Sequence, residues 1–464
     1  MKKYQTIVIG SGPGGYVAAI RLAQLGKSVA IVERFQDHVG GVCLNEGCIP
    51  TKALINSAKF FDSAKEAEIS AVELKAGIPD MAKMVSAALN TSAQLRNGIK
   101  YLFKKNNIDL IVGNARIASK NSLIVTNNGK DDEFLADNFI IATGSRPKVL
   151  ASLEADEKNV LTSDGVFKLK QTPKALLIIG GGAIGVEFGS LFNSFGSNVT
   201  IVELEEQLLP LEDKEIAIEM TKYLKKRGIE IFTKSQVLEL QRKPNSRIAK
   251  IKTNNETIEK EFEYVLVCVG RSPNTENLGL EKIGLTLEKG FIKVNEKMQT
   301  SVDNIYAIGD CINSPMLAHV ASVEGILAAE IIAGLKSEPI DYSSIPSVVY
   351  SQFEAASVGL TEELAREKGL DVVICKHFFK SCPKALLLHK DDGFVKIIAD
   401  KKTFKIIGVH IAGIGASELI HEFVLAKANN LRLQDIAKTT HAHPSLSEIV
   451  VDAAKSVFDK PIHG

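Results

Sequence analysis

One segment of the chain occurs twice, and this repeat constrains the fold more than any other feature of the sequence. The stretch 7–33, IVIGSGPGGYVAAIRLAQLGKSVAIVE, matches the stretch 177–203, LIIGGGAIGVEFGSLFNSFGSNVTIVE, at an offset of 170 residues. Each copy reads as a short β-branched strand, a Gly-x-Gly-x-x-Gly turn, an amphipathic helix stopped by glycine and a second strand ending in glutamate. The sequence therefore predicts one βαβ unit, present twice.

The glycine-rich turn of such a unit is suited to a dinucleotide. The first glycine permits the tight turn, the second lets a pyrophosphate approach the backbone, and the third lets helix and strand pack closely. A carboxylate about 20 residues further on can accept hydrogen bonds from a ribose. Two complete copies predict two bound dinucleotides. The residues that carry this prediction are Gly10, Gly12, Gly15 and Glu33 in the first copy, and Gly180, Gly182, Gly185 and Glu203 in the second.

The second copy favours NAD over NADP. A 2′-phosphate requires a cationic partner beyond the second strand. After Glu203 the sequence runs LEEQLLP, without lysine or arginine. An arginine supplied from elsewhere in the fold is the alternative.

Composition excludes several classes of function. The 464 residues suffice for about two to four domains. Hydrophobic residues at 45%, charged residues at 24% and a net charge of +1 are typical of an ordinary α/β protein without a basic field for nucleic acid. The start, MKKYQTIVIGSGPGG, lacks the pattern of a signal peptide, and no apolar stretch approaches the ~18 residues that span a bilayer. We expect a cytosolic protein, in which six cysteines are unsuited to a structural disulfide framework.

Strand and turn patterns continue beyond the two copies. The stretches FIIATGSRPK (139–148), YVLVCVGRSPNTENLGL (264–280) and TSVDNIYAIGDC (300–311) are apolar runs that end in glycine, where a cofactor could approach. Asp310 in the last of them is suited to bind a polyol hydroxyl. From Ile345 onward, alternating strands and two helices at about 416–430 and 445–458 predict a separate α+β domain.

Two cysteines stand five residues apart in the stretch 40–54, GGVCLNEGCIPTKAL. A zinc site would need two more ligands, and only His38 lies near in the sequence. A regular helix separates the Cα atoms of residues five apart by ~8–9 Å, whereas a disulfide needs less than ~7 Å. Gly47 and Pro50 permit a distorted first turn before the helical run that follows. The residues leave a redox pair, a structural staple, a metal ligand pair and unrelated thiols as alternatives.

Several motifs together resemble one family, the pyridine nucleotide-disulfide oxidoreductases. They are the cysteine stretch, the two glycine-rich copies, GGGAIGVE, VGRSPNTENLGL, IYAIGD, MLAHVASVEG and HAHPSLSE, and they follow the family order over nearly the whole chain. The resemblance is nearest to the members that oxidise dihydrolipoamide. Glutathione reductases normally carry NADP-selecting arginines and mercuric reductases often carry a C-terminal cysteine pair, whereas this chain ends in DKPIHG and has neither.

The resemblance implies FAD on the first copy and NAD on the second. It implies an α/β fold with an FAD-binding domain, an NAD-binding domain, a central domain that completes the FAD site and an α+β dimerisation domain, at 1–150, 151–270, 271–345 and 346–464. FAD would be held by Gly10, Gly12, Gly15, Glu33, Gly41, Val42, Lys52, Ala115, Thr143, Gly144, Asp310, Met316, Leu317, Ala318 and His319. NAD would be held by Gly180, Gly182, Gly185, Glu187, Glu203, Val237 and Gly270.

The resemblance also assigns catalytic roles. Cys43 would be the interchange thiol that attacks lipoamide, and Cys48 the thiol against the flavin. Lys52 and Glu187 would form an ion pair beside the flavin N5, although Lys52 taken alone reads as a solvated helix residue.

His443 would take the proton of dihydrolipoamide, with its ring oriented by Glu448. In the family this segment comes from the partner subunit, which makes a homodimer necessary for activity. The alternative is structural, because Ser445 and Glu448 also match a capping box that begins the last helix.

The predicted activity is the oxidation of protein-bound dihydrolipoamide through a Cys43–Cys48 redox disulfide and FAD, with reduction of NAD. The implied partners are lipoyl domains of 2-oxoacid dehydrogenase complexes or the lipoyl protein of glycine cleavage. The alternatives are another NADH-dependent disulfide or metal reductase of the family, or a catalytically silent flavoprotein subunit. Two residues depart from the family pattern: Glu46 stands where an apolar residue is frequent, and Phe353 where proline is usual.

Overall fold

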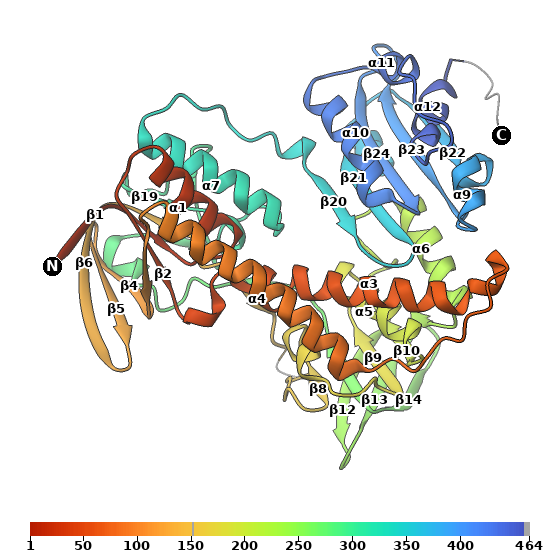
Figure 1. The fold of residues 1–464 in the computed structure, drawn as a ribbon, viewed down its shortest axis with the longest axis horizontal. Coiled ribbons are helices and arrows are strands. Elements are labelled where there is room, and N and C mark those ends of the chain that lie inside the picture. The colour runs from red at the N-terminus through yellow and green to blue at the C-terminus, as the bar shows by residue number, and fades with distance from the viewer. Residues whose placement is uncertain (151–152, 459–464) are drawn as a thin grey trace. The chain divides into compact units, whose positions relative to one another are not determined.

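The computed structural model describes residues 1–150 and 153–458, and the chain divides into two compact units (Figure 1). Unit 1 consists of Met1–Ala53, Lys83–Lys148 and Gly270–Ile340. Unit 2 consists of Leu54–Ala82, Val149–Val269 and Asp341–Gly464. The last six residues, DKPIHG, lie outside the described residues. They are the segment in which the sequence shows no cysteine pair.

Unit 1 is built on a seven-stranded sheet with the order β3-β2-β1-β6-β5-β4, and β19 pairs with β6. Strands β1, β2, β3, β6 and β19 run parallel, and the β4–β6 meander is antiparallel. Their apolar residues are buried on both faces, as expected for a parallel sheet covered by helices. The bounds are β1 Lys2–Ile9, β2 Val29–Glu33, β3 Asp109–Val112, β4 Asn114–Ser119, β5 Ser122–Asn127, β6 Lys130–Ile141 and β19 Ile305–Ala307.

Helices α1 (Pro13–Gln24) and α7 (Ala318–Ala333) lie side by side against this sheet (Figure 1). Glycines permit this close packing, because a Cβ on Gly14 would lie 2.9 Å from the carbonyl oxygen of Ala321. Likewise a Cβ on Gly325 would lie 2.5 Å from the carbonyl oxygen of Gly14. The unit thus brings the start of α7 next to the first glycine-rich turn. The remaining helices that contribute residues are α2 Gly41–Asn45, α3 Cys48–Lys65 and α4 Met81–Lys105.

Unit 2 contains a parallel sheet of five strands with the order β11-β10-β9-β15-β8, and a three-stranded antiparallel sheet, β12-β13-β14. Helix α5 follows β9, and α6 follows β10. The bounds are β8 Val160–Leu161, β9 Ala175–Ile179, α5 Ala183–Ser194, β10 Asn198–Val202, α6 Lys214–Lys226, β11 Glu230–Phe232, β12 Gln236–Arg242, β13 Arg247–Lys252, β14 Thr257–Phe262 and β15 Tyr264–Val267.

The C-terminal part of unit 2 is an antiparallel sheet with the order β20-β21-β24-β23-β22, packed against α10 and α12. The bounds are β20 Pro346–Val349, β21 Glu354–Gly359, α8 Glu362–Glu367, β22 Val372–Phe378, α9 Pro383–Leu387, β23 Gly393–Asp400, β24 Ile406–Gly413, α10 Ala416–Ala428, α11 Leu433–Ala437 and α12 Glu448–Lys455.

The structure confirms the predicted α/β class and both βαβ units, β1-α1-β2 and β9-α5-β10. The predicted C-terminal strands are present, and α10 ends two residues before the predicted bound. The final helix is shorter than predicted: it begins at Glu448 rather than at Ser445. The sequence missed three short helices, α8, α9 and α11. The four-part division of the chain stays a prediction.

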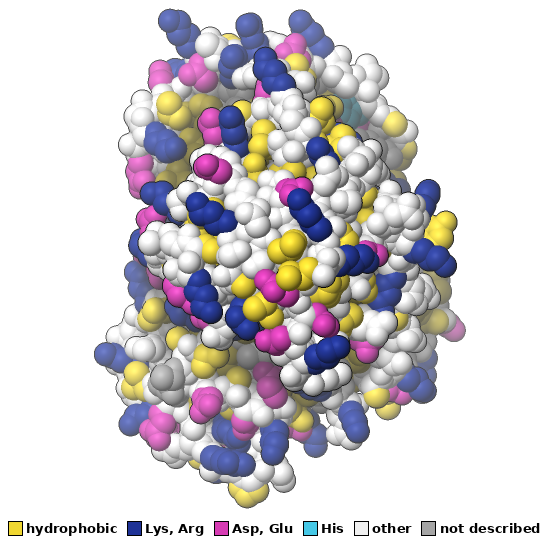
Figure 2. All heavy atoms as spheres, turned by 90° about the vertical axis from the view of Figure 1, so that its left-hand side faces the viewer, with side chains coloured by type: hydrophobic (Ala, Val, Ile, Leu, Met, Phe, Trp, Pro, Cys, Tyr) yellow, Lys and Arg dark blue, Asp and Glu magenta, His cyan; other side chains and the backbone are white. Residues whose placement is uncertain are grey.

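The surface carries charges of both signs. On the face drawn in Figure 2, lysine and arginine side chains are interspersed with aspartate and glutamate, and apolar side chains lie between them. Within residues 1–150 and 153–458, no helix combines the length and apolar character needed to cross a bilayer.

Candidate active site

The first glycine turn, residues 10–15, has the geometry of a pyrophosphate cradle. Gly10 has a φ of +104°, and a Cβ there would overlap the carbonyl oxygen of Ala142. A Cβ on Gly15 would overlap the carbonyl oxygen of Gly10. Gly12 has no heavy atom within 4 Å of the place a Cβ would take, and it stands directly before the N-terminus of α1. A phosphate therefore fits at Gly12, where helix N–H groups point.

Glu33, at the end of β2, reaches back to this turn. Its Oε2 accepts hydrogen bonds from the backbone N–H of Ser11 at 3.1 Å and from Ser11 Oγ at 2.6 Å. Its Oε1 accepts from the N–H of Arg34 at 2.7 Å. The carboxylate is thus held next to the cradle, where a ribose hydroxyl can approach it.

The second glycine turn, residues 180–185, repeats this geometry. Gly180 has a φ of +107°, Gly182 has open space at its Cβ position, and Gly185 packs against the carbonyl oxygen of Gly180. Glu203 Oε2 accepts from the N–H of Gly181 at 2.5 Å, and Oε1 accepts from the N–H of Glu205 at 2.8 Å. Both turns therefore fit a dinucleotide.

The redox loop, residues 40–48, rests on the first glycine turn. The N–H of Gly40 donates to the carbonyl oxygen of Ser11 at 3.0 Å. Gly41 has a φ of +67°, and a Cβ there would lie 2.6 Å from the Cα of Gly12. Only glycine permits this approach, so the loop that carries the cysteines is seated directly on the cradle.

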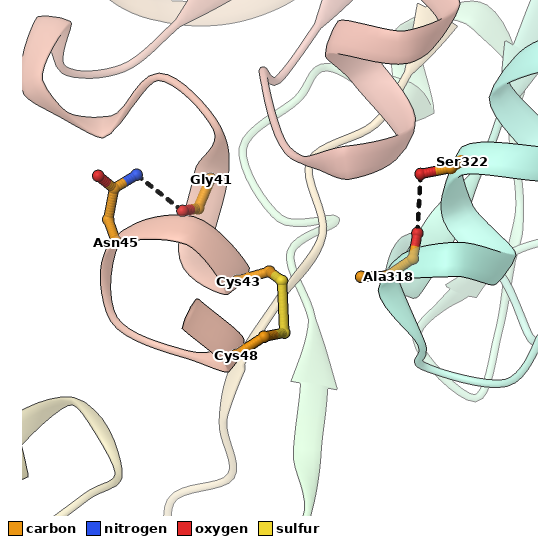
Figure 3. The surroundings of a disulfide bond; sticks show 6 residues. All are labelled: Gly41, Cys43, Asn45, Cys48, Ala318 and Ser322. Atoms are coloured by element: carbon orange, nitrogen blue, oxygen red, sulfur yellow. Dashed lines mark hydrogen bonds between the residues drawn. A yellow bond between two sulfur atoms is a disulfide. The ribbon is translucent and has the colours of Figure 1, made fainter. Parts of the chain in front are cut away.

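Cys43 and Cys48 form a disulfide (Figure 3). Cys43 lies in α2 and Cys48 is the first residue of α3, while Glu46 and Gly47 interrupt the helix between them. The Cα atoms are 4.7 Å apart, far less than the ~8–9 Å of a regular helix. The predicted irregular turn is confirmed, with Pro50 in the first turn of α3. Both cysteines are half-buried, which leaves the pair accessible to a reagent.

A buried asparagine inside the redox loop fixes its shape. Asn45 Nδ2 donates to the carbonyl oxygens of His38, Val39 and Gly41 at 3.2, 3.1 and 2.9 Å. Its Oδ1 accepts from Arg96 Nη1 of α4 at 2.6 Å. Figure 3 shows Asn45 on the side of the loop away from the disulfide. The sequence analysis missed this role; its only signal was an asparagine, a residue that often bonds local backbone.

The departure at Glu46 has a partner. His38 Nε2 lies 3.2 Å from Glu46 Oε1, and both side chains are partly exposed. The pair stands at the outer side of a loop whose centre is held by Asn45.

The other cysteines differ from the redox pair, because they are free thiols in the described part of the chain. Burial raises the pKa of the Cys311 thiol to about 12 and that of Cys375 to about 11, and it raises the pKa of Cys268 as well. Since the thiolate is the nucleophile, these three thiols are unreactive near neutral pH.

Of the remaining predicted FAD residues, Thr143 lies against the first turn and Asp310 is held by Ser145. The Cα of Thr143, which follows β6, lies 3.3 Å from the Cβ position of Gly10. Thr143 Oγ1 donates to the carbonyl oxygen of Asn274 at 2.6 Å. Asp310 Oδ2 accepts from Ser145 Oγ at 2.5 Å.

The segment 316–319 leads into the first turn of α7. Figure 3 shows Ala318 and Ser322 on α7 across from the disulfide. His319 is exposed in that first turn. Ala115 lies half-buried in β4, paired with Val125.

The remaining predicted NAD residues lie in different surroundings. Glu187 is on α5, only 4% exposed, and its Oε1 accepts from the N–H of Tyr350 at 2.9 Å. Val237 is in β12 with its side chain in the core. Gly270 belongs to unit 1. The predicted Lys52–Glu187 pair would join residues of different units and stays a prediction.

His443 and Glu448 are in contact, as predicted. His443 Nδ1 lies 2.9 Å from Glu448 Oε1, and the histidine side chain is 68% exposed. This bond favours the proton on Nδ1 and makes Nε2 the nitrogen that can accept a proton.

The capping prediction for Ser445 is wrong in part. Glu448 Oε2 accepts from the N–H of Ser445 at 2.9 Å, which is one half of a capping box. Ser445 Oγ, however, bonds Ser447 Oγ at 2.9 Å, and Ser447 is the N-cap residue. The carboxylate of Glu448 is shared between the histidine and the backbone, and the helix begins at Glu448 after the N-cap Ser447.

Comparisons with known proteins agree with this site. Residues 4–325 match the family described as pyridine nucleotide-disulphide oxidoreductase, and residues 345–454 match the dimerisation domain of the same family. The chain belongs to the pyridine nucleotide-disulphide oxidoreductases. The predicted family and the predicted α/β architecture with a dimerisation domain are therefore confirmed. At the level of the family, the prediction of an oxidoreductase that uses FAD, NAD and a redox disulfide is confirmed as well.

Relatives within the family are similar over their full length. Dihydrolipoyl dehydrogenase of Bacillus subtilis is 43% identical over 460 residues, which covers 99% of this chain and 97% of the relative. Mitochondrial dihydrolipoyl dehydrogenase of Pisum sativum is 40% identical over 98% of this chain and 92% of its own. The HOCl-induced flavoprotein disulfide reductase of Escherichia coli, as a Cu(II) complex, has a TM-score of 0.89 at 29% identity over 98% of this chain and 100% of its own.

Proposed function

We propose that this oxidoreductase oxidises protein-bound dihydrolipoyl groups with NAD, through the Cys43–Cys48 disulfide and FAD. The observation that carries the proposal is the seat of Gly41 on Gly12, because it joins a disulfide loop to a dinucleotide cradle. The full-length similarity to proteins named dihydrolipoyl dehydrogenase supports the choice of substrate.

The thiol chemistry follows from the cysteine pair. A thiolate of the dihydrolipoyl group attacks Cys43 Sγ, which breaks the Cys43–Cys48 bond and forms a mixed disulfide. The second lipoyl thiol then attacks the lipoyl sulfur of that mixed disulfide and releases the cyclic lipoyl disulfide. Two electrons and two protons have then left the substrate: one proton is on the base described below, and the other leaves Cys43 and Cys48 as one thiol and one thiolate.

The proton of the attacking thiol needs an acceptor. His443 Nε2 takes this role, and Glu448 stabilises the resulting imidazolium through the bond at Nδ1. In the homodimer that we propose, His443 and Glu448 act on the cysteines of the other subunit.

The cofactor residues keep the roles that the resemblance implies. When bound, FAD supplies the two-electron relay between the dithiol and NAD. Gly12 and Glu33 would hold its pyrophosphate and ribose, and Gly182 and Glu203 would hold those of NAD. Lys52 and Glu187 would pair beside the flavin. We further propose a cytosolic location, and as partners the lipoyl domains of 2-oxoacid dehydrogenase complexes or the lipoyl protein of glycine cleavage.

One experiment tests this proposal against its rivals. The purified protein is inspected for a flavin absorption spectrum, and NAD reduction by dihydrolipoamide is compared with NADPH oxidation by glutathione disulfide. We expect turnover with the first pair of substrates only. Turnover with the second pair alone would identify a different disulfide reductase, and a yellow protein without turnover would be a silent flavoprotein subunit.

A further inference from the structure

Glu187 of α5 is held by a loop from the C-terminal sheet. The loop that connects β20 to β21, residues 350–353, will be called the clamp loop. The N–H of Tyr350, its first residue, donates to Glu187 Oε1 at 2.9 Å. Because a backbone N–H cannot rotate away from its chain, the position of the carboxylate depends on the position of the clamp loop.

Gln352 of the clamp loop bonds the same face of α5. Its Oε1 accepts from Ser190 Oγ, and its Nε2 donates to Ser194 Oγ at 2.6 Å. Glu187, Ser190 and Ser194 are three and four residues apart, so they share one helix face. The clamp loop therefore grips three successive turns of α5, at the carboxylate and at two fully buried hydroxyls.

These hydrogen bonds run in one direction and end on a charged pair. Ser194 Oγ lies 2.7 Å from Asp62 Oδ2, which also accepts from Arg227 Nη2 at 2.8 Å. Ser190, Gln352 and Ser194 thus form a donor chain towards a buried carboxylate. Such a chain fixes the amide orientation of Gln352, and a hydrocarbon in its place would leave two buried hydroxyls without these partners.

Phe353, which replaces the proline usual in the family, anchors the other end of the clamp loop. Its ring stacks on Tyr223 of α6 with centroids 4.8 Å apart and an interplanar angle of 17°. Tyr223 OH accepts from Arg227 Nη1 at 3.3 Å, which links this stack to the charged pair. Phe353 is 4% exposed. The departure from the family pattern is therefore part of the same buried assembly.

We propose that Gln352 is a positioning residue for the redox reaction. By joining Ser190 to Ser194 it fixes the rotation of α5 against the clamp loop, and so the position of the Glu187 carboxylate. Helix α5 also begins at the second glycine turn, so the same contact sets the direction of its N-terminus. The inference rests on the proposed function, which assigns Glu187 to the flavin and this turn to NAD.

The test replaces Gln352 in the holoenzyme. In Gln352→Leu we expect the rate constant for reduction of the bound flavin by saturating NADH to fall roughly tenfold to a hundredfold, as displaced groups in active sites do. The NADH concentration that half-saturates this rate should change by less than about twofold. Stopped-flow absorbance of the flavin and the melting temperature are both measured.

Two further variants make the result decisive. Ser190→Ala removes one hydroxyl of the chain and should give a smaller loss of the rate constant, whereas Gln241→Leu on the exposed side of β12 is the matched control and should match the parent. Parental rate constants in both Gln352→Leu and Ser190→Ala would overturn the inference, even with a lower melting temperature. If Gln352→Leu does not fold, Ser190→Ala decides. A parent that lacks dihydrolipoamide turnover but whose flavin accepts electrons from NADH would instead refute the proposed function.

Discussion

The two glycine turns have the same geometry, but the loops that follow them serve different ends. In the first copy the N–H of Gly40 donates to the carbonyl oxygen of Ser11. In the second copy the N–H of Leu209 donates to the carbonyl oxygen of Gly181 at 2.8 Å. Ser11 and Gly181 occupy the same place in the repeat. The same kind of backbone hydrogen bond therefore supports each loop. The residues that follow it determine whether the loop carries the redox disulfide or stabilises the fold.

The first loop is mostly half-buried and carries the disulfide, whereas the second includes buried residues that stabilise the fold. After its anchor the first loop continues through Gly41 to the disulfide. The second buries Leu208 and Leu209 and ends at Asp213, which is fully buried and caps α6 through the N–H of Glu215 at 3.1 Å. The comparison teaches that a repeated backbone can be kept while its connecting loop changes from a reactive to a structural role.

A charged cluster completes the second loop. Lys396 Nζ, 1% exposed on its side chain, lies 3.0 Å from Asp213 Oδ1, 2.7 Å from Glu215 Oε2 and 2.8 Å from Glu362 Oε2. Burial would raise the pKa of Asp213, but the charges of His410 and Lys396 hold it below its ordinary value. Burial would lower the pKa of Lys396, and its three carboxylate partners raise it instead.

The largest effect should come from the cysteine of the first loop. We expect Cys43→Ser to lower NAD reduction by dihydrolipoamide at least a thousandfold, about 4 kcal/mol, because the exchange step loses its sulfur. The initial rate of NADH formation measures this change. Cys375→Ala, a buried thiol outside the site, is the control and should retain the parental rate. A Cys43→Ser enzyme within tenfold of the parent would show that the loop is not the redox element.

The next effect should come from the structural loop. Asp213→Asn leaves Lys396 with fewer charged partners and should lower the free energy of unfolding by about 3 kcal/mol, measured by urea titration at neutral pH. The Cys43→Ser protein, which cannot form the disulfide, is the contrasting variant. It should lose activity but keep the stabilisation that Asp213 provides.

This stabilisation also has a defined pH dependence. Because the pKa of Asp213 is depressed in the folded state, its contribution is present above the unfolded value near 4 and is lost as the pH falls through the lower folded value. The difference in stability between the parent and Asp213→Asn should therefore narrow below about pH 4. A difference that stays constant down to about pH 2 would contradict the role of this carboxylate.

A third pair of variants separates the two cradles. Gly12 and Gly182 have negative φ values of −63° and −72°, which other residues adopt, and open Cβ positions, so alanine fits both without backbone strain. Gly12→Ala should weaken flavin binding by roughly tenfold, about 1.4 kcal/mol, and Gly182→Ala should weaken NAD binding by a similar factor with flavin retained. Flavin absorbance after dialysis and NADH titration measure the two effects. Equal loss of flavin in both variants would show that the assignment of FAD to the first turn and NAD to the second is wrong.

The smallest effect concerns Glu46. Its Cα is at most ~7.6 Å from that of Cys48, since only Gly47 intervenes and two virtual Cα–Cα bonds join them, and this is within a Debye length of about 8 Å. Glu46→Val should move the midpoint of the thiolate-to-flavin absorbance to lower pH, by less than about one pH unit, because a negative charge opposes the thiolate. An unmoved midpoint would dispose of the idea. His38→Gln, which removes the partner of Glu46, should move the midpoint the other way.

Local patterns made much of the fold predictable from the sequence. The glycines, the β-branched strands and the closing glutamates of both copies lie within 27 residues, so the βαβ units could be read directly. The irregular turn between the cysteines was predictable from Gly47 and Pro50, whereas their disulfide was implied only by the family resemblance. The contact of His443 with Glu448 followed from the family motif and from their short separation.

Contacts between distant segments could not be read in this way. The bond of Asn45 to Arg96 and the seat of Gly41 on Gly12 depend on segments that the fold brings together. The environment of Phe353 was left open by the sequence, because Tyr223 is 130 residues away. The start of the last helix was misjudged because the capping-box pattern pointed to Ser445, whereas the N-cap residue is Ser447.

The contact of Gly41 with Gly12 limits how this active site can be transplanted or redesigned. A side chain added at Gly41 would collide with the backbone of the cradle, so residue 41 of the redox loop must stay glycine wherever the loop rests on such a turn. The second copy offers an equivalent turn at residue 182 and an anchor at the carbonyl oxygen of Gly181, but the buried Leu208 and Leu209 occupy the loop that follows it. A redox loop grafted there would have to replace these two buried leucines and keep the glycine that corresponds to Gly41.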